Sequence, residues 1–435
     1  MTDITETVQS AQSTFRPSLS LRANFRWTFV GNIINAASQW GMLVVIAKMT
    51  TSTELGRFAL GLAIAAPITA IVLLQLQIVL VTDVTREYRF GHYLGARLVL
   101  TLFGFLAIAA IACFGHYERD TVWVILLVGL AKAAEWTSEL VRGLFQRAER
   151  MDISSISLMI KGPTSLAILA LLIWITGSIK IGLLGVAITN IGILAIYDLP
   201  NGFRLLSERL PLNQVWGEIL PCFDFSVLIR LIRKVIPLGV GVFLFTLQSN
   251  VPRYFLEHYH GASVLGYFSA MAYISAIGAM IVAAMGQSAS PRLARHYSED
   301  PQAFRRLVNR LLGLGVLLGL AFVGGAAAFG KPVLTIIYSQ EYASYHFDFI
   351  VISLAGAISF VASFCGFALV AARSFKFQLI AGVTSTLTAI VLASILVPLK
   401  GMFGAAITLF CGSFITCVLY YTWLYLIIRK RQLSR

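Results

Sequence analysis

The chain has 435 residues, of which 58% are hydrophobic and only 12% are charged. An average soluble domain has about 25% charged residues, so this composition excludes a soluble multidomain protein, a disordered chain and a coiled coil. The net charge of +14 would suit a nucleic-acid binder, but the basic residues stand in short clusters between long apolar runs. The composition therefore predicts a polytopic membrane protein without a nucleic-acid partner.

Twelve segments are long and apolar enough to span a membrane as helices, because a helix needs about 20 apolar residues to cross the hydrocarbon core. The predicted fold class is all-α, with about twelve transmembrane helices arranged in two six-helix bundles. The expected spans are residues 27–49, 58–82, 98–115, 121–141, 153–177, 181–199, 235–257, 262–289, 307–330, 347–371, 377–397 and 402–428.

The distribution of Lys and Arg predicts the orientation in the membrane. Of the 34 basic residues, 25 fall on the side of the amino terminus, six on the opposite side and three inside spans. Cytoplasmic segments of membrane proteins carry the excess of positive charge. Both termini are therefore expected in the cytoplasm.

A shift of 210 positions aligns the beginnings of the two halves of the chain, placing Leu55 and Gly56 on Leu265 and Gly266. This shift equals six spans, so the repeat predicts two halves of the same orientation that enclose a site. The expected domains are a disordered cytoplasmic tail at 1–26, an N-terminal six-helix bundle at 27–199, a cytoplasmic interfacial linker at 200–234, a C-terminal six-helix bundle at 235–428 and a basic cytoplasmic tail at 429–435.

The end of the linker, residues 227–235, has an apolar helical face and a basic face that includes Arg230 and Arg233. One interpretation is a helix lying among the lipid headgroups. The other is a short helix packed on the protein itself.

Charged side chains inside spans are costly, so they are the first candidates for function. Lys132, Glu135, Glu139 and Arg142 follow one another at spacings of three, four and three, on one face of the fourth span. Two interpretations stay open: a ladder of ion pairs that holds the helix to its neighbours, and a relay of protons or ions.

Lys161 stands alone in the fifth span and is followed by Gly162 and Pro163, which should loosen the helix there. An unpaired lysine beside a kink favours a cavity. The alternative is that its long side chain reaches the cytoplasmic surface.

The seventh span contains Gln248, Asn250 and Arg253 within an otherwise apolar helix, and Glu257 lies four residues beyond the arginine. Arg253 is expected either to face a cavity or to pair with Glu257. The first span carries a polar stripe of Asn32, Asn35 and Gln39. We expect these amides to border a cavity shared with the seventh span, against the alternative of hydrogen bonds between helices.

Other kinds of site find no support in the sequence. No phosphate-binding G-x-x-x-x-G-K-[ST] loop is present, the five cysteines show no metal or disulfide spacing, and no outer loop is long enough for a catalytic domain. We therefore expect a transporter rather than an enzyme, without a cofactor or metal. An H⁺ gradient and a Na⁺ gradient both stay open as energy sources.

Four stretches of the sequence carry a family resemblance: IAKMTTSTELGRFAL from Ile46, YRFGHYLGARL from Tyr88, NVPRYFLEHYHGASVLGYFSA from Asn250 and GQSASPRLARHY from Gly286. In these stretches the chain resembles the polysaccharide transport family, the Wzx-type flippases of O-antigen and capsular repeat units in the multidrug/oligosaccharidyl-lipid/polysaccharide (MOP) superfamily. The family's common Asp-Arg pair of the seventh span reads Pro252-Arg253 here, so only the arginine is carried over.

The resemblance implies alternating access around a cationic cavity in the bacterial inner membrane. The implied cargo is a polyprenyl diphosphate that carries an oligosaccharide repeat, and the implied partners are membrane lipids and the polymerase and chain-length proteins of the same pathway. A diphosphate in a low-dielectric core needs protein cations, for which Arg253 and Lys161 are the candidates. The amides listed above are the candidates for sugar contacts.

The alternative function is a multidrug or cation antiporter of the same superfamily. Such a protein needs a carboxylate deep in a cavity, and Glu135 and Glu139, with Lys132 beside them, are the candidates for a coupling relay. A lipid II flippase would be expected to show fourteen spans rather than twelve.

Overall fold

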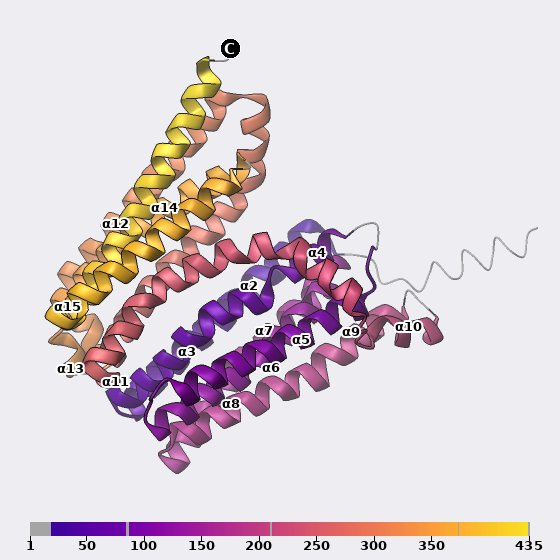
Figure 1. Ribbon diagram of the computed structural model, residues 1–435, viewed down its shortest axis with the longest axis horizontal. Coiled ribbons are helices and arrows are strands. Elements are labelled where there is room, and N and C mark those ends of the chain that lie inside the picture. The colour runs from indigo at the N-terminus through magenta and orange to yellow at the C-terminus, as the bar shows by residue number, and fades with distance from the viewer. Residues whose placement is uncertain (1–18, 84–86, 209–210, 373, 434–435) are drawn as a thin grey trace, which may run out of the picture. The chain divides into compact units, whose positions relative to one another are not determined.

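The computed structural model describes residues 19–83, 87–208, 211–372 and 374–433, and these residues are almost entirely helical (Figure 1). Residues 1–18 of the predicted tail at 1–26 lie outside the described residues. Helix α2 begins at Leu21, earlier than the expected start of the first span. The helices are α2 Leu21–Met49, α3 Ser52–Leu73, α4 Leu76–Thr82, α5 Phe90–Phe114, α6 Arg119–Arg147, α7 Met151–Thr176, α8 Ile179–Ile193, the π-helix η1 Leu194–Asp198, α9 Leu199–Ser207, α10 Leu212–Ile219, α11 Phe225–Glu299, α12 Pro301–Ile337, α13 Gln340–Ala343, α14 His346–Ala371 and α15 Phe375–Leu433.

Two of these helices are interrupted by a glycine in a conformation that other residues rarely adopt. Gly261 in α11 has φ 80° and Gly401 in α15 has φ 55°, and each separates two membrane-length arms. Nine described segments are long and apolar enough to span a membrane, and the two interruptions raise the number to eleven. With α6, whose charged residues reduce its hydropathy, the described residues provide the twelve expected helices.

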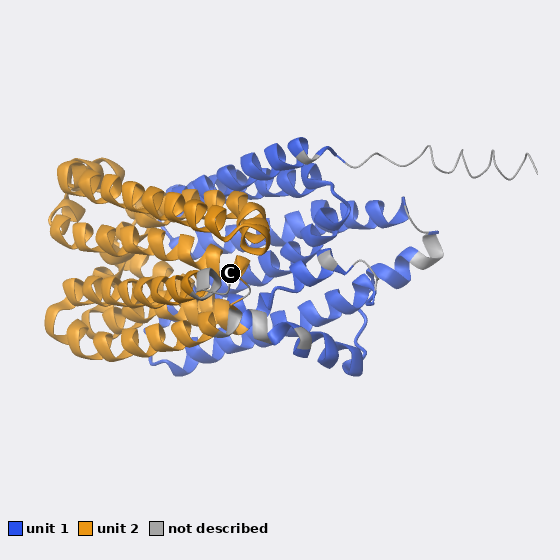
Figure 2. Cartoon of the chain, turned by 90° about the horizontal axis from the view of Figure 1, so that it is seen from above, with its two compact units in different colours: residues 1–42, 68–239 blue, residues 43–67, 240–435 orange. Residues whose placement is uncertain are grey.

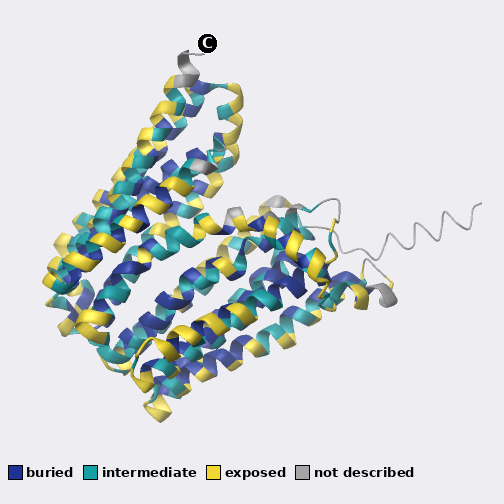
Figure 3. Cartoon of the chain, viewed as in Figure 1, coloured by how far each residue is buried: buried dark blue, intermediate teal, exposed yellow. Residues whose placement is uncertain are grey.

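Exposed positions run along these helices (Figure 3), and many of them carry large apolar residues. Phe103 is 65% exposed, Trp174 75% and Leu320 67%. A water-soluble protein rarely exposes so many large apolar groups, whereas a hydrocarbon environment favours them. These surfaces are therefore suited to contact with lipid.

The chain forms two compact units, coloured separately in Figure 2: unit 1 comprises Met1–Met42 and Ile68–Gly239, and unit 2 comprises Leu43–Pro67 and Val240–Arg435. The predicted division into domains stays a prediction. In unit 1, Leu228, Leu231 and Val235 of the linker helix lie in the core with α4, α5, α6 and α9. Its apolar face therefore packs on the protein.

Unit 2 has its own core, formed by α11, α12, α14 and α15 around Phe360 and Phe364. The side chain of Asp300 caps the beginning of α12 by accepting hydrogen bonds from the backbone N–H groups of Gln302 and Ala303, at 2.9 and 3.0 Å.

Within unit 2, the two glycines related by the 210-residue repeat lie against each other's helices. A Cβ atom on Gly56 of α3 would overlap the carbonyl of Ala262, and one on Gly266 of α11 would overlap the carbonyl of Ser52. Ser52 and Ser263 also share a hydrogen bond of 2.8 Å between their hydroxyls. The absence of side chains at both glycines lets the two backbones approach this closely.

Candidate functional site

The α6 charges of unit 1 contact neighbouring helices as well as one another. Glu135 accepts hydrogen bonds from Lys132 at Oε2 and from Lys161 of α7 at Oε1, both 2.8 Å long. The Lys161 side chain is only 6% exposed. One carboxylate thus binds two ammonium groups, and this triad retains one net positive charge.

Lys161 therefore does not stand alone, and the prediction of an unpaired lysine beside a kink was wrong. Helix α7 continues through Pro163 to Thr176. Gly162 lies against α2, where an added Cβ would meet the side chain of Ser38 and the backbone of Asn35. This close packing supports α7 across the proline, and the pairing with Glu135 brings Lys161 toward α6.

Glu139 pairs with a residue that the sequence analysis missed, Arg97 of α5, at 2.9 Å. Arg97 is completely buried and also donates to the carbonyl of Val72 at 2.9 Å. The chain turns between α3 and α4 at Leu74 and Gln75, both with positive φ, which leaves nearby carbonyls without helical donors. Arg97 thus donates hydrogen bonds both to a carbonyl at the break between α3 and α4 and to the Glu139 carboxylate.

The other end of the α6 row faces a second missed residue. Asp198, the last residue of the π-helix, is fully buried and lies close to the hydroxyls of Ser138 and Ser157 and to the charge of Arg142. Arg142 is buried too, and its Nη1 lacks a hydrogen-bond partner in the part of the chain that the structure describes. The predicted ladder of ion pairs within α6 is therefore present only in part. Among the described residues, Lys132–Glu135 is the one ion pair formed between two residues of α6.

The polar stripe of α2 is not a uniform face. Asn32 and Gln39 are exposed and Asn35 is half-buried, with its Oδ1 lacking a partner among the described residues. These three residues belong to unit 1, whereas the amides of the seventh span belong to unit 2. Their expected role as sugar contacts stays a prediction.

In unit 2, Arg253 is held by its own helix. Its Nη1 donates to Asn250 Oδ1 at 2.7 Å and to the Ser249 carbonyl at 3.1 Å. Its guanidinium lies 6.0 Å from the ring centres of Phe268 and Tyr273. No carboxylate in the described ranges forms an ion pair with Arg253, so the alternative of a pair with Glu257 is wrong. A guanidinium without a protein carboxylate is available to an anion.

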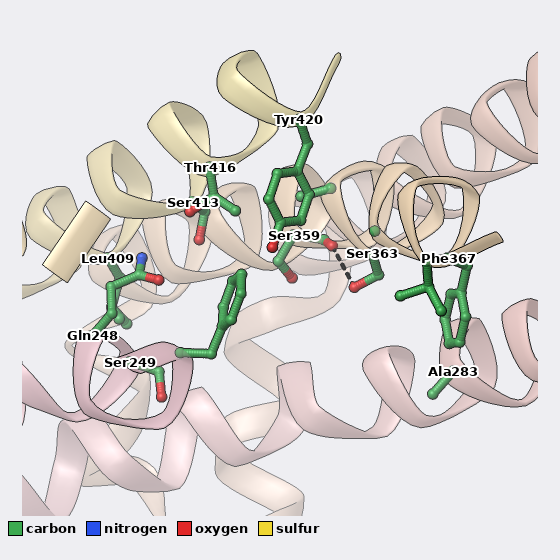
Figure 4. A pocket seen from close by; sticks show the side chains of 14 residues that line it. Gln248, Ser249, Ala283, Ser359, Ser363, Phe367, Leu409, Ser413, Thr416 and Tyr420 are labelled. Carbon is green, nitrogen blue, oxygen red and sulfur yellow. Dashed lines mark hydrogen bonds between the residues drawn. The ribbon is translucent and has the colours of Figure 1, made fainter. Parts of the chain in front are cut away.

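Unit 2 contains a pocket of about 460 Å³, formed by both arms of α11, α14 and the second arm of α15. Figure 4 shows Gln248 and Ser249 on one side, Ser413 and Thr416 across from them, and Phe367 with Ala283 at the opposite end. None of its fourteen lining residues is charged. Gln248 thus lines a pocket, as a candidate ligand contact, whose other walls could not be predicted from the sequence.

The comparisons with known proteins agree with this architecture. Residues 21–297, more than half of the chain, match the family described as "Polysaccharide biosynthesis protein". The "Capsular polysaccharide biosynthesis protein CapF" of Staphylococcus aureus is 25% identical over 400 residues, which cover 92% of this chain and 98% of that one.

Solved structures share the fold at low identity. The "Lipid II flippase MurJ" in its inward closed conformation has a TM-score of 0.68 at 13% identity, covering 93% of this chain and 87% of that one. An outward-facing multidrug resistance MATE family transporter has a TM-score of 0.60 at 12% identity, covering 92% and 93%. A MOP superfamily transporter from Pyrococcus furiosus has a TM-score of 0.58 at 14% identity, covering 93% of each chain.

The predicted fold class is confirmed by these likenesses: the chain is an all-helical polytopic membrane protein with the fold of the MOP-superfamily transporters. The family resemblance read from the sequence is confirmed as well. The family model matches residues 21–297, and the relative from Staphylococcus aureus aligns along nearly the whole chain. The protein is a member of the polysaccharide biosynthesis protein family.

Proposed function

We propose that the protein is a flippase that moves polyprenyl-diphosphate-linked oligosaccharide repeat units from the cytoplasmic to the periplasmic leaflet by alternating access. The product pathway is the synthesis of O-antigen, capsule or exopolysaccharide. The family membership supports the polysaccharide pathway, and the likeness to a structure named as a lipid II flippase supports a lipid-linked cargo. The proposed location is the bacterial inner membrane, with both termini in the cytoplasm.

The observation that carries this proposal is the state of Arg253. A guanidinium in an apolar helix is costly, and a protein retains it where it meets a function or an ion partner. Among the described residues its hydrogen-bond partners are an amide oxygen and a backbone carbonyl, both neutral. A diphosphate would supply the missing negative charge, and the planar guanidinium can bind two of its oxygens at once.

Lys161 and Arg253 are proposed to hold the diphosphate at different stages of transport. The Lys132–Glu135–Lys161 triad has two ammonium groups for one carboxylate. Lys161 is the member of this triad that we assign to the diphosphate. The proposed partners are membrane lipids and the polymerase and chain-length proteins of the same pathway.

The proposal is tested by deleting the gene and extracting lipids. We expect undecaprenyl-diphosphate oligosaccharide to accumulate on the cytoplasmic leaflet and the surface polymer to disappear. If the polymer persists while efflux of dyes or cations falls, the protein is an antiporter instead.

The role of Arg253 is tested by complementing the deletion strain with variants. Arg253→Gln should abolish polymer export at normal protein abundance, and Arg253→Lys should restore it in part, because lysine keeps the charge but loses the planar fork. Glu257→Gln is the matched control, since Glu257 forms no ion pair with Arg253. Equal damage from Glu257→Gln, or normal export by Arg253→Gln, would remove Arg253 from the site.

A further inference from the structure

We propose that the exposed side of α12 binds an acidic phospholipid of the membrane, with the phosphate held by Arg306 and Arg310 and an acyl chain lying along the apolar residues that follow them. The lipid belongs to the leaflet on the side of Arg310, which is the cytoplasmic leaflet in the proposed orientation. The inference assigns a lipid partner to the transporter and does not involve its cargo.

Helix α12 is longer than the membrane is thick. Its 37 residues extend over about 55 Å, whereas the hydrocarbon core measures about 30 Å. Residues 311–330 contain no charged side chain, and this stretch alone covers the thickness of the core. Arg310 therefore lies at the boundary between hydrocarbon and headgroups, and Arg306 lies one turn further out, among the headgroups.

One side of α12 is fixed against the rest of unit 2. Phe304 and Val308 are buried in the core of this unit. A Cβ atom on Gly319 would approach the Cβ of Ala357 on α14 to 2.9 Å, so the two helices are in close contact there. These contacts fix the rotation of α12 about its axis, and its other side faces away from the core.

That other side carries a continuous row of exposed residues. Successive members are three or four positions apart, so they lie one above another along the helix. The exposed row consists of Arg306, Arg310, Gly313, Leu317, Leu320 and Gly324. It changes from basic to apolar between Arg310 and Gly313, at the depth where headgroups give way to acyl chains.

The two arginines of the exposed row lack a negative partner in the protein. Neither Arg306 nor Arg310 forms an ion pair with a described residue. The nearest acidic residues in the sequence are engaged elsewhere, since Glu299 binds Arg295 and Asp300 caps α12. Side chains four positions apart on a helix are neighbours, so both guanidinium groups can donate to one phosphate.

The apolar part of the exposed row suits an acyl chain. A Cβ atom on Gly313 or Gly324 would meet nothing within 4 Å, and Leu317 and Leu320 are exposed between these glycines. The rise from Gly313 to Gly324 is about 16 Å, close to half of the hydrocarbon core and hence to the depth of one leaflet. A soluble anion would leave this stretch uncovered, and an undecaprenyl chain is much longer than it.

The experiment measures lipid binding to the purified full chain by native mass spectrometry. The probes are dioleoyl phosphatidylglycerol, dioleoyl phosphatidylcholine, which has the same chains but no net charge, and glycerol 3-phosphate, which has no chains. We expect phosphatidylglycerol to bind more tightly than both other probes. High salt should weaken its binding, because the arginines are exposed.

Paired arginine variants test the phosphate contact. Arg306→Gln combined with Arg310→Gln should weaken the binding of phosphatidylglycerol about 30-fold, since each basic residue near an anionic lipid contributes about fivefold. The matched control is Arg204→Gln combined with Arg230→Gln, two exposed arginines of unit 1 whose loss changes the net charge equally. This control should leave the binding nearly unchanged.

Substitutions at Gly313 test the same contact from the neighbouring position of the row. Gly313→Glu places a carboxylate three residues from Arg310, where it would pair with the arginine and repel the phosphate. Gly313→Gln is the control, because it adds a side chain of the same size without charge. We expect Gly313→Glu to lose most of the binding of phosphatidylglycerol and Gly313→Gln to retain most of it.

Several results would overturn the inference. Phosphatidylcholine or glycerol 3-phosphate could bind as tightly as phosphatidylglycerol, or the two double arginine variants could lose binding equally. If citronellyl diphosphate displaces phosphatidylglycerol at a lower concentration through the same two arginines, the exposed row binds the cargo lipid and the phospholipid site is refuted. Failure of the phospholipid site leaves the flippase proposal standing, because the assay measures no transport.

Discussion

Replacing Glu135 with glutamine tests whether the charges of unit 1 are structural or take part in coupling. Glu135 binds both Lys132 and Lys161, and both contacts are 2.8 Å long. Glu135→Gln keeps the shape of the side chain but removes the carboxylate to which the buried Lys161 ammonium is hydrogen-bonded. Breaking a buried ion pair by removing one partner costs about 3–5 kcal/mol.

The lower end of this range applies, because one fifth of the Glu135 side chain is exposed and glutamine can still accept a hydrogen bond. About 3 kcal/mol is a large part of the roughly 5–15 kcal/mol that stabilises most domains, and it corresponds to a fall in melting temperature of about 6 °C. The assay is the melting of purified protein in detergent, followed by size-exclusion chromatography. Glu299→Gln, which removes an exposed pair with Arg295, should change the melting temperature little.

A second substitution identifies the cause. Lys161→Met in the Glu135→Gln background removes the uncompensated charge and should restore part of the lost stability, which a double-mutant cycle measures. Adding Glu139→Gln should destabilise further, because the buried Arg97 would lose its carboxylate. If the Glu135→Gln and Glu139→Gln variants fold normally but transport no longer depends on an H⁺ or Na⁺ gradient, the ion-pair interpretation is refuted and the relay is supported.

Three further predictions concern topology, packing and pH. Reporter fusions after Lys180 should report the outer side and fusions after Arg209 the cytoplasm; the reverse result would overturn the orientation. Gly266→Ala should lower the melting temperature because its Cβ has no space, whereas Gly313→Ala, in open space on α12, should not; equal melting would refute the close contact. The backbone hydrogen bonds to Asp300 lower the pKa of its carboxyl. Its capping contribution to stability should therefore be complete above about pH 4 and be lost as the pH falls through the lowered pKa. Melting curves of the Asp300→Asn variant should lack this pH dependence.

The membrane helices could be predicted from the sequence because each must carry its own run of apolar residues. Even the interruptions of α11 and α15 fall between expected spans, at Gly261 and Gly401. The beginnings of helices were less accurate. Arg97 was placed just before a span that in fact begins at Phe90, so its burial and its pairing with Glu139 were missed.

For the candidate site, individual residues could be predicted from the sequence, but most contacts between helices could not. Spacing along one helix indicated Lys132 with Glu135, but it could not show that Lys161 reaches the same carboxylate, because that contact depends on how α6 and α7 pack. The pocket could not be predicted either, because its walls also depend on how the helices pack. Gln248 was recognised as a polar residue in an apolar helix, whereas its neighbours Ser413 and Phe367 lie on helices far away in sequence.

The contact between Gly56 and Gly266 has a consequence for the order in which the protein is made. Residues 43–67 belong to unit 2, yet they are synthesised long before the rest of that unit. Until the second arm of α11 has been inserted, the glycine surface of α3 has no partner for its closest backbone contact. Unit 2 therefore cannot fold step by step as its residues are translated. Helix α3 is inserted into the membrane early, and its contact with α11 forms only after a segment some 200 residues later has been made.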